Sequence, residues 1–287
     1  MRHFFRILLY RFELRVPALE FGDAAPAGQY EFLWSSPDEP YLSRLRTEFD
    51  LAQLAAEADT EYERVRAVSR WARARWKHGN DGAENGDPIS ILREAALGRE
   101  FRCVEYAAVL AAALNALGIA ARPVGLWKRS VETDEGGAGH LVVEAYLESL
   151  GKWIMVDGQF DVTPVLEGVP LSALELQLAL AEARPGVGVD SSAPLRADQY
   201  LEWLAPFLFY LHVRLDNRYD AVTDAAKLML VPSGAKEPAV FQRIEPVRDM
   251  VFTRSPSRFY APARASGPPD PAGSRGRALP GRQMSRP

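Results

Sequence analysis

The chain has 287 residues, of which 47% are hydrophobic and 25% charged, and its formal net charge is −4. This composition is typical of a soluble globular protein, and it lacks the basic excess that favours nucleic-acid binding. The single cysteine, Cys103, excludes an internal disulfide and a cysteine-based zinc cluster. The four histidines lack the spacing of a metal hydrolase, so we expect no metal ion and no cofactor.

The N-terminal apolar stretch FFRILLY is short and is interrupted by Arg6. It is too short to span a bilayer, and no small-residue cleavage pattern of a signal peptide follows it. We therefore expect a cytoplasmic protein that does not contact membranes. Apolar and charged residues then alternate over 10–16, which predicts a half-buried strand.

Helices are predicted next. Thr60 and Glu63 have the spacing of a capping box, and the apolar residues that follow recur every three or four positions, which predicts a helix within 59–78. Asp87 followed by Pro88 is typical of a helix start, and it predicts a short helix over 88–97.

Cys103 begins a third predicted helix. Apolar residues recur at helical spacing from Cys103 onward, and Gly118 provides the stop. The remaining face is mostly alanine, so we expect the helix to be covered on most sides. The sequence therefore places the thiol of Cys103 at the N-terminus of a buried helix.

Two strands, 140–147 and 152–159, follow a strand at 121–131 and are separated by the turn ESLG. They are expected to form an antiparallel hairpin. With either of two registers, His140 lies opposite Asp157 or one diagonal step from it, on the same face. Glu144 shares that face and is expected to be a strand-surface residue in preference to a substrate contact.

The three side chains together suggest nucleophilic catalysis. A helix N-terminus and a neighbouring imidazolium both favour a thiolate, and a carboxylate orients the imidazole. Taken singly, Cys103 is more often a buried filler, His140 a strand residue and Asp157 a turn residue. The backbone N–H of Cys103 is a candidate oxyanion donor, and the indole N–H of Trp76 is a candidate for the second.

The stretches GREFRCVEYAAVLAAALNALGIAARPV and GAGHLVVEAYLESLGKWIMVDGQF resemble the transglutaminase-like superfamily of papain-type cysteine enzymes. The resemblance extends over about 60–182. It implies that Cys103 is the nucleophile, His140 the general base and acid, and Asp157 the orienting residue. Trp76 and Gly139 are expected to contact substrate. Arg102 stands where many family members have glycine, which suggests a divergent subgroup.

The expected fold is α+β of the papain or transglutaminase type, with a helical lobe and the cysteine helix packed on an antiparallel sheet. Residues 184–194 are expected to form a loop at a boundary. The expected organisation has four parts: an N-terminal strand region at 1–30, a transglutaminase-like core at 31–183, a β-rich extension at 195–264 and a disordered tail at 265–287.

The function favoured by the sequence is thiol-dependent acyl transfer or hydrolysis at an amide of a peptide or protein, through a thioester on Cys103. Hydrolysis is favoured over cross-linking. The alternative from another class is a non-catalytic protein that keeps the fold for binding or scaffolding. Redox sensing ranks below both, because the chain has no second cysteine to resolve an oxidised thiol.

Overall fold

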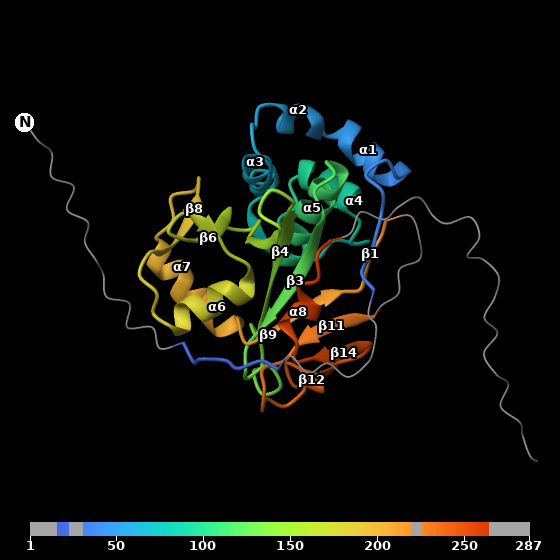
Figure 1. Cartoon of the computed structure of the whole chain (residues 1–287). Helices are drawn as coiled ribbons and strands as arrows, with labels where there is room; N and C mark the ends of the chain where they lie inside the picture. The colour runs from blue at the N-terminus through green and yellow to red at the C-terminus, as the bar shows by residue number, and fades with distance from the viewer. Residues whose placement is uncertain (1–15, 23–30, 220–225, 264–287) are drawn as a thin grey trace, which may run out of the picture.

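The computed structural model describes residues 16–22, 31–219 and 226–263. Of the strand predicted at 10–16, only Val16 lies within this part, and the tail predicted at 265–287 lies outside it. A six-stranded sheet in the order β14-β11-β9-β3-β4-β5 forms the centre of the fold (Figure 1). Its neighbouring strands are antiparallel except for the pair β11 and β14.

The strands of this sheet come from two distant parts of the sequence. The first part supplies β3 (Ala121–Trp127), β4 (Gly139–Leu147) and β5 (Lys152–Val156). The second supplies β9 (Tyr210–Arg214), β11 (Lys227–Leu230) and β14 (Met250–Thr253). Strand β9 pairs with β3, so residues beyond 195 extend the sheet that carries the hairpin.

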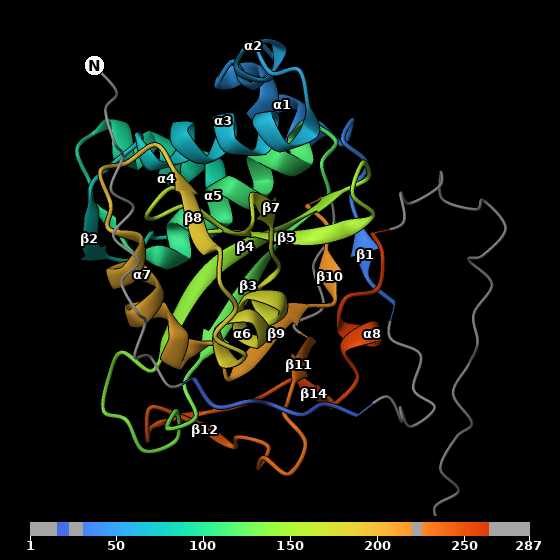
Figure 2. The ribbon, with the colours of Figure 1, turned by 60° about the vertical axis from the view of Figure 1, so that its left-hand side comes forward.

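One face of the sheet is covered by five helices, which form the upper part of the molecule in Figure 2. The helices are α1 (Pro40–Glu48), α2 (Leu51–Ala56), α3 (Glu61–Arg73), α4 (Pro88–Ala96) and α5 (Cys103–Ala116). The predicted starts of α3 and α4 are confirmed. Thr60 and Glu63 make both hydrogen bonds of the capping box, and the Asp87 side chain accepts a hydrogen bond from the backbone of Ser90.

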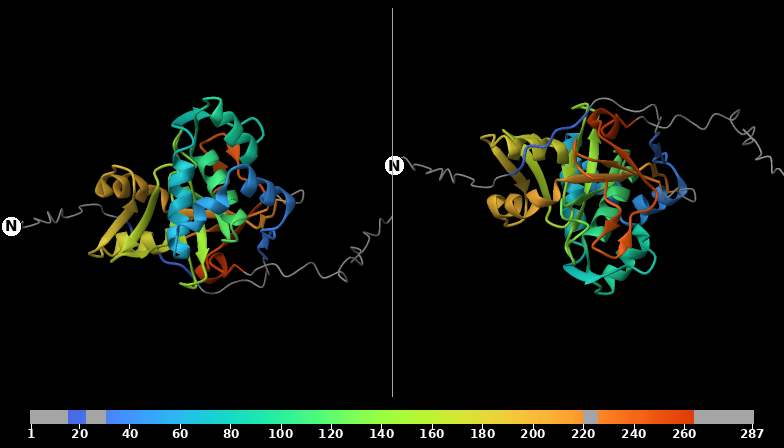
Figure 3. Two further views of the ribbon diagram at one scale, coloured as in Figure 1. Left: turned by 90° about the horizontal axis from the view of Figure 1, so that it is seen from above. Right: turned by 90° about the horizontal axis from the view of Figure 1, so that it is seen from below.

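The other face is covered by a second group of elements, which Figure 3 shows to one side of α1–α5. They are β6 (Val162–Leu166), β7 (Val169–Pro170), α6 (Ala173–Ala181), β8 (Val187–Ser191), α7 (Ala197–Leu204) and the 3-10 helix η1 (Ala205–Phe207). The loop expected at 184–194 is wrong, because β8 pairs with β6 over its whole length. The glycine-rich sequence of this segment does not predict a strand, and the strand forms by pairing with β6, which is distant in sequence.

Both faces of the hairpin are buried, because helices cover the sheet on each side. Val143 and Ala145 of β4 pack toward α5, while Val142 packs toward α6 and α7. The expectation that Glu144 lies on a strand surface is therefore wrong. Its side chain is fully buried and forms a salt bridge of 3.0 Å with Arg122 of β3.

The remaining elements are short. They are β1 (Leu33–Trp34), β2 (His78–Asp81), β10 (Asp216–Asn217), β12 (Val240–Phe241), β13 (Glu245–Pro246) and α8 (Pro256–Phe259). Together with the central sheet and the two flanking groups, they make a mixed fold of helices and sheets. The expected fold class is confirmed. No helix in the part of the chain that the structure describes is both long and apolar enough to cross a membrane.

Candidate functional site

Cys103 is the first residue of α5, and its side chain is partly exposed. The helix begins there because Arg102 adopts an extended backbone and its N–H donates to the Glu105 carboxylate at 3.2 Å. Phe101, which is fully buried, anchors the chain before this turn. The first N–H groups of a helix lack partners within the helix and carry a partial positive charge. The thiol therefore lies where a negative charge is stabilised.

Glu105 is buried beside this helix start. Its carboxylate also accepts a hydrogen bond from the backbone N–H of Ala83 and forms a salt bridge of 3.1 Å with Arg102. The sequence pattern did not distinguish between a solvent-facing and an arginine-facing Glu105. In the structure, Glu105 pairs with Arg102, and its hydrogen bond from Ala83 connects the loop at 82–87 to the first turn of α5.

The hairpin adopts the wider of the two predicted registers. Val143 pairs with Val156 and Leu147 with Lys152, so His140 lies one diagonal step from Asp157. The Nε2 atom of His140 is 2.7 Å from Oδ2 of Asp157. Both side chains are buried. The predicted proximity of His140 and Asp157 is therefore confirmed.

Three further groups hold the carboxylate of Asp157. The backbone N–H groups of Gln159 and Phe160 donate to Oδ1, at 3.0 and 3.3 Å. This is the local turn expected of an aspartate at a strand end. The Tyr200 hydroxyl of α7 donates to Oδ2 at 2.8 Å, the same oxygen that faces His140. One oxygen is thus held by the turn and the other is shared between the imidazole and a buried tyrosine.

The pKa of His140 is shifted by opposing effects. Burial disfavours the imidazolium, but the charge of Asp157 and its hydrogen bond outweigh burial, and Cys103 adds to them, so that the pKa rises to about 10. Cys103 therefore lies close enough to the imidazole to interact with its charge. The protonated ring is the stable form near neutral pH.

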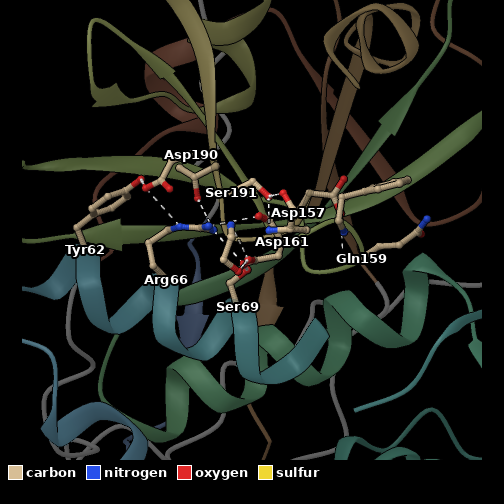
Figure 4. A network of polar contacts seen from close by, with 12 residues as sticks. Tyr62, Arg66, Ser69, Asp157, Gln159, Asp161, Asp190 and Ser191 are labelled. Carbon is tan, nitrogen blue, oxygen red and sulfur yellow. Dashed lines mark hydrogen bonds and ion pairs between the residues drawn. The ribbon is translucent and has the colours of Figure 1, made fainter. Parts of the chain in front are cut away.

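The turn after Asp157 is fastened to α3 by a buried polar network (Figure 4). Asp161, which has a positive φ of 53°, forms a salt bridge of 3.1 Å with Arg66 and accepts a hydrogen bond from Ser69 at 2.7 Å. Arg66 also contacts Asp190, which accepts a hydrogen bond from Tyr62. The network joins α3, the turn and β8, so it restrains the turn that follows Asp157.

The two predicted substrate contacts have different surroundings. Trp76 is 6% exposed and packs against Phe101 and Tyr106, and among the described residues its indole N–H has no hydrogen-bond partner. Gly139 opens β4 beside Trp127, and a Cβ atom there would lie 3.0 Å from that ring. The missing side chain of Gly139 therefore lets an aromatic ring approach the strand next to His140. Contact of either residue with substrate remains a prediction.

Sequence reasoning missed the residues that α7 and η1 bring to the site. Tyr200 reaches Asp157, and the rings of Trp203 and Phe207 lie 5.0 and 6.2 Å from the ring of His140. The signal was present in DQYLEWLAPF, where aromatic residues recur at spacings of three and four. It was overlooked because 195–264 was expected to be rich in strands.

No group of three or more His, Cys, Asp or Glu side chains within the described ranges is arranged to hold a metal ion. The groups that converge on the site are a thiol, an imidazole, a carboxylate, a phenol and backbone N–H groups. This set can lower the barrier to nucleophilic attack on a carbonyl and to proton transfer.

Residues 51–158 match the model of the transglutaminase-like superfamily, and this range contains Cys103, His140 and Asp157. No curated protein matches the sequence. Solved structures similar to the chain include a TGase, with 18% identity, 41% of this chain and 31% of that chain covered, and a TM-score of 0.31.

Two other similar structures are described as protease candidates. One is a cysteine protease candidate from Cytophaga hutchinsonii, with 18% identity, 53% of this chain and 50% of that chain covered, and a TM-score of 0.32. The other is a protease candidate from Parabacteroides distasonis ATCC 8503, with 17% identity, 42% and 29% covered, and a TM-score of 0.28. The chain spans between about a third and a half of the length of these three structures. Over residues 51–158, the chain is therefore similar to the core of the transglutaminase-like superfamily.

Proposed function

We propose that this protein breaks an amide bond of a peptide or protein substrate through a thioester on Cys103. The observation that carries the proposal is the buried His140–Asp157 pair, 2.7 Å apart, beside a thiol at the N-terminus of α5. A charged imidazole next to a thiol favours the thiolate, which is the nucleophilic form.

In the first step, the sulfur of Cys103 attacks the carbonyl carbon and the carbonyl oxygen becomes an oxyanion. Because Nε2 of His140 faces Asp157, Nδ1 is the ring nitrogen left to exchange a proton at the reacting centre. The imidazolium gives its proton to the amide nitrogen, the C–N bond breaks and the amine leaves. Asp157 keeps the ring oriented and stabilises its charge.

In the second step, the neutral imidazole takes a proton from water, and the resulting nucleophile attacks the thioester. The acid is released and the thiolate–imidazolium pair forms again. An amine can replace water at this step and would give transfer in place of hydrolysis. We favour hydrolysis over transfer to an amine.

The oxyanion requires hydrogen-bond donors in fixed positions. We assign the first donor to the backbone N–H of Cys103, which lies in the unpaired first turn of α5. We assign the second donor to Trp76, whose buried indole N–H is unpaired in the described part of the chain and which packs on Tyr106 of α5. An N–H that is left unpaired in the free protein costs about 1 to 3 kcal/mol, which substrate binding would recover.

Mass spectrometry of the intact protein tests the proposal. The protein is mixed with a panel of peptide and amide substrates and quenched in acid, and an acyl adduct is sought on Cys103. We expect the adduct in the natural protein and none in Cys103→Ala. A protein that binds peptides but never forms the adduct would support the scaffold alternative and overturn the proposal.

A further inference from the structure

Three aromatic rings form a wall on one side of His140. We call Phe160, Trp203 and Phe207 the aromatic shelf. Their ring centroids lie 6.2, 5.0 and 6.2 Å from that of His140. Figure 2 shows α7, which carries Trp203, beside the end of β4 at which His140 lies.

Trp203 is 41% exposed, although the other residues that fix α7 are buried. Its ring contacts Phe160 on one side and Phe207 on the other, with centroid distances of 5.2 and 5.3 Å. A tryptophan that is held by two neighbours loses little freedom when a ligand packs on it. An ordered, half-exposed indole beside a reactive group is typical of a binding subsite.

The position of the shelf indicates which half of the substrate it meets. The proton that His140 delivers goes to the leaving amine, so the substituent on that nitrogen must lie beside the imidazole ring. The shelf is packed on that ring. Lys128, whose Nζ atom lies 4.7 Å from the centre of the Phe207 ring, adds a positive charge at its edge. This charge disfavours a cationic substituent, although an isolated tryptophan would attract one.

We propose that the aromatic shelf binds an uncharged apolar group, preferably an aromatic one, on the leaving amine of the substrate. In a peptide this group is the side chain of the residue that follows the scissile bond. The inference rests on the proposed function, because it assigns the subsite from the direction of proton delivery. By microscopic reversibility, the same subsite must bind an amine that attacks the thioester.

Amine partitioning tests this inference. An activated aryl ester acylates Cys103, and the burst of nitrophenol reports the acyl-enzyme. Methylamine, isoamylamine, 2-phenylethylamine and 1,5-diaminopentane are then compared at equal concentrations of free amine. The measured quantity is the ratio of amide to acid product, which is independent of the acylation rate.

We expect 2-phenylethylamine to be captured at least about tenfold better than methylamine, as expected for burial of a phenyl group. Isoamylamine should be intermediate, and the diamine should be captured more poorly than isoamylamine. Trp203→Ala should reduce the phenylethylamine preference to less than about threefold, while Trp203→Phe should retain part of it. Gln199→Ala, at an exposed and uncharged position on α7, should leave every ratio unchanged.

The two ideas fail in different ways. Absence of a burst, or a burst that persists in Cys103→Ala, would overturn the proposed function. A burst on Cys103 followed by equal partitioning of all amines, including no capture of any of them, would overturn the assignment of the shelf. So would a phenylethylamine preference that survives in Trp203→Ala.

Discussion

Strand β4 carries two buried charged side chains on one face, His140 and Glu144, and each is paired with a partner from a neighbouring segment. Glu144 pairs with Arg122 at 3.0 Å, and the arginine also lies 4.2 Å from the centre of the Trp153 ring. His140 pairs with Asp157 at 2.7 Å and lies beside a thiol. Both pairs are buried on one face of β4, but their chemistry differs.

The two pairs differ in whether the basic side chain can release its proton. Arginine stays protonated at any pH at which the protein folds, so the Arg122–Glu144 pair can only hold the structure. Its partners agree with that role. Arg122 donates to the backbone carbonyl of Phe259, and Glu144 accepts from Tyr260 and from the backbone of Ala173. The pair thus fastens the C-terminal segment and α6 to the sheet, while the imidazole can transfer its proton.

Replacing the titratable member should have the largest effect on activity. His140→Gln should lower kcat/KM by about 10⁴-fold, or about 5 kcal/mol, because general acid and base catalysis are both lost. Steady-state hydrolysis of a substrate found by mass spectrometry measures the change. His78→Gln, at an exposed position, is the matched control and should keep full activity. Equal losses in both variants would contradict the assignment.

Replacing the carboxylate of the other pair should affect stability and leave the chemistry intact. Glu144→Gln should lower the free energy of unfolding by about 3 to 5 kcal/mol, since Arg122 is left charged and buried without a counterion. Urea denaturation measures it. The double variant Arg122→Met with Glu144→Leu should recover most of the loss. A single variant as stable as the natural protein would show that the buried charge finds another partner.

Tyr200 offers a finer test, because its hydroxyl shares the Asp157 oxygen that faces His140. Tyr200→Phe should reduce kcat by about 20-fold, close to 2 kcal/mol, since a hydrogen bond to a charged group is worth about 1.5 to 3 kcal/mol. The control is Tyr210→Phe, which removes a tyrosine hydrogen bond to the Lys236 carbonyl. That variant should lose stability only. If the two variants had the same kcat, Tyr200 would not position Asp157.

The last prediction concerns the dependence of stability on pH, which is the smallest effect when it is counted per pH unit. The pKa of His140 is raised from 6.5 to about 10 in the folded protein, so folding favours the bound proton. The stabilisation is fully present below about pH 6.5 and is lost as the pH rises toward 10, by at most about 1.4 kcal/mol per pH unit. Urea denaturation from pH 6 to 10 should show this slope in the natural protein. His140→Gln should lack that part of the slope, and an identical slope in both proteins would contradict it.

Much of the site could be predicted from local patterns. Helix α5 follows from its apolar spacing, with Gly118 at its end in a left-handed conformation. The pairing of His140 with Asp157 follows from the period of two residues in a strand and from the length of the turn. These features depend on residues near one another in the chain, for which sequence patterns carry information.

Other features had no local signal. Glu144 looks like a surface residue in the alternation of β4, because nothing nearby in sequence shows that α6 and the C-terminal segment cover that face. Strand β8 shows no strand pattern and forms because β6 offers it an edge.

The sequence by itself determined the candidate nucleophile, its helix, and the histidine and aspartate of the hairpin, because short-range periodicity sets each of them. Only the tertiary structure decided what surrounds them. It placed Tyr200 on Asp157 and Trp203 against His140, across separations of 43 residues and more. The physical reason is that these contacts arise from two layers of helices packing on one sheet, and the choice of packing partner depends on the whole chain.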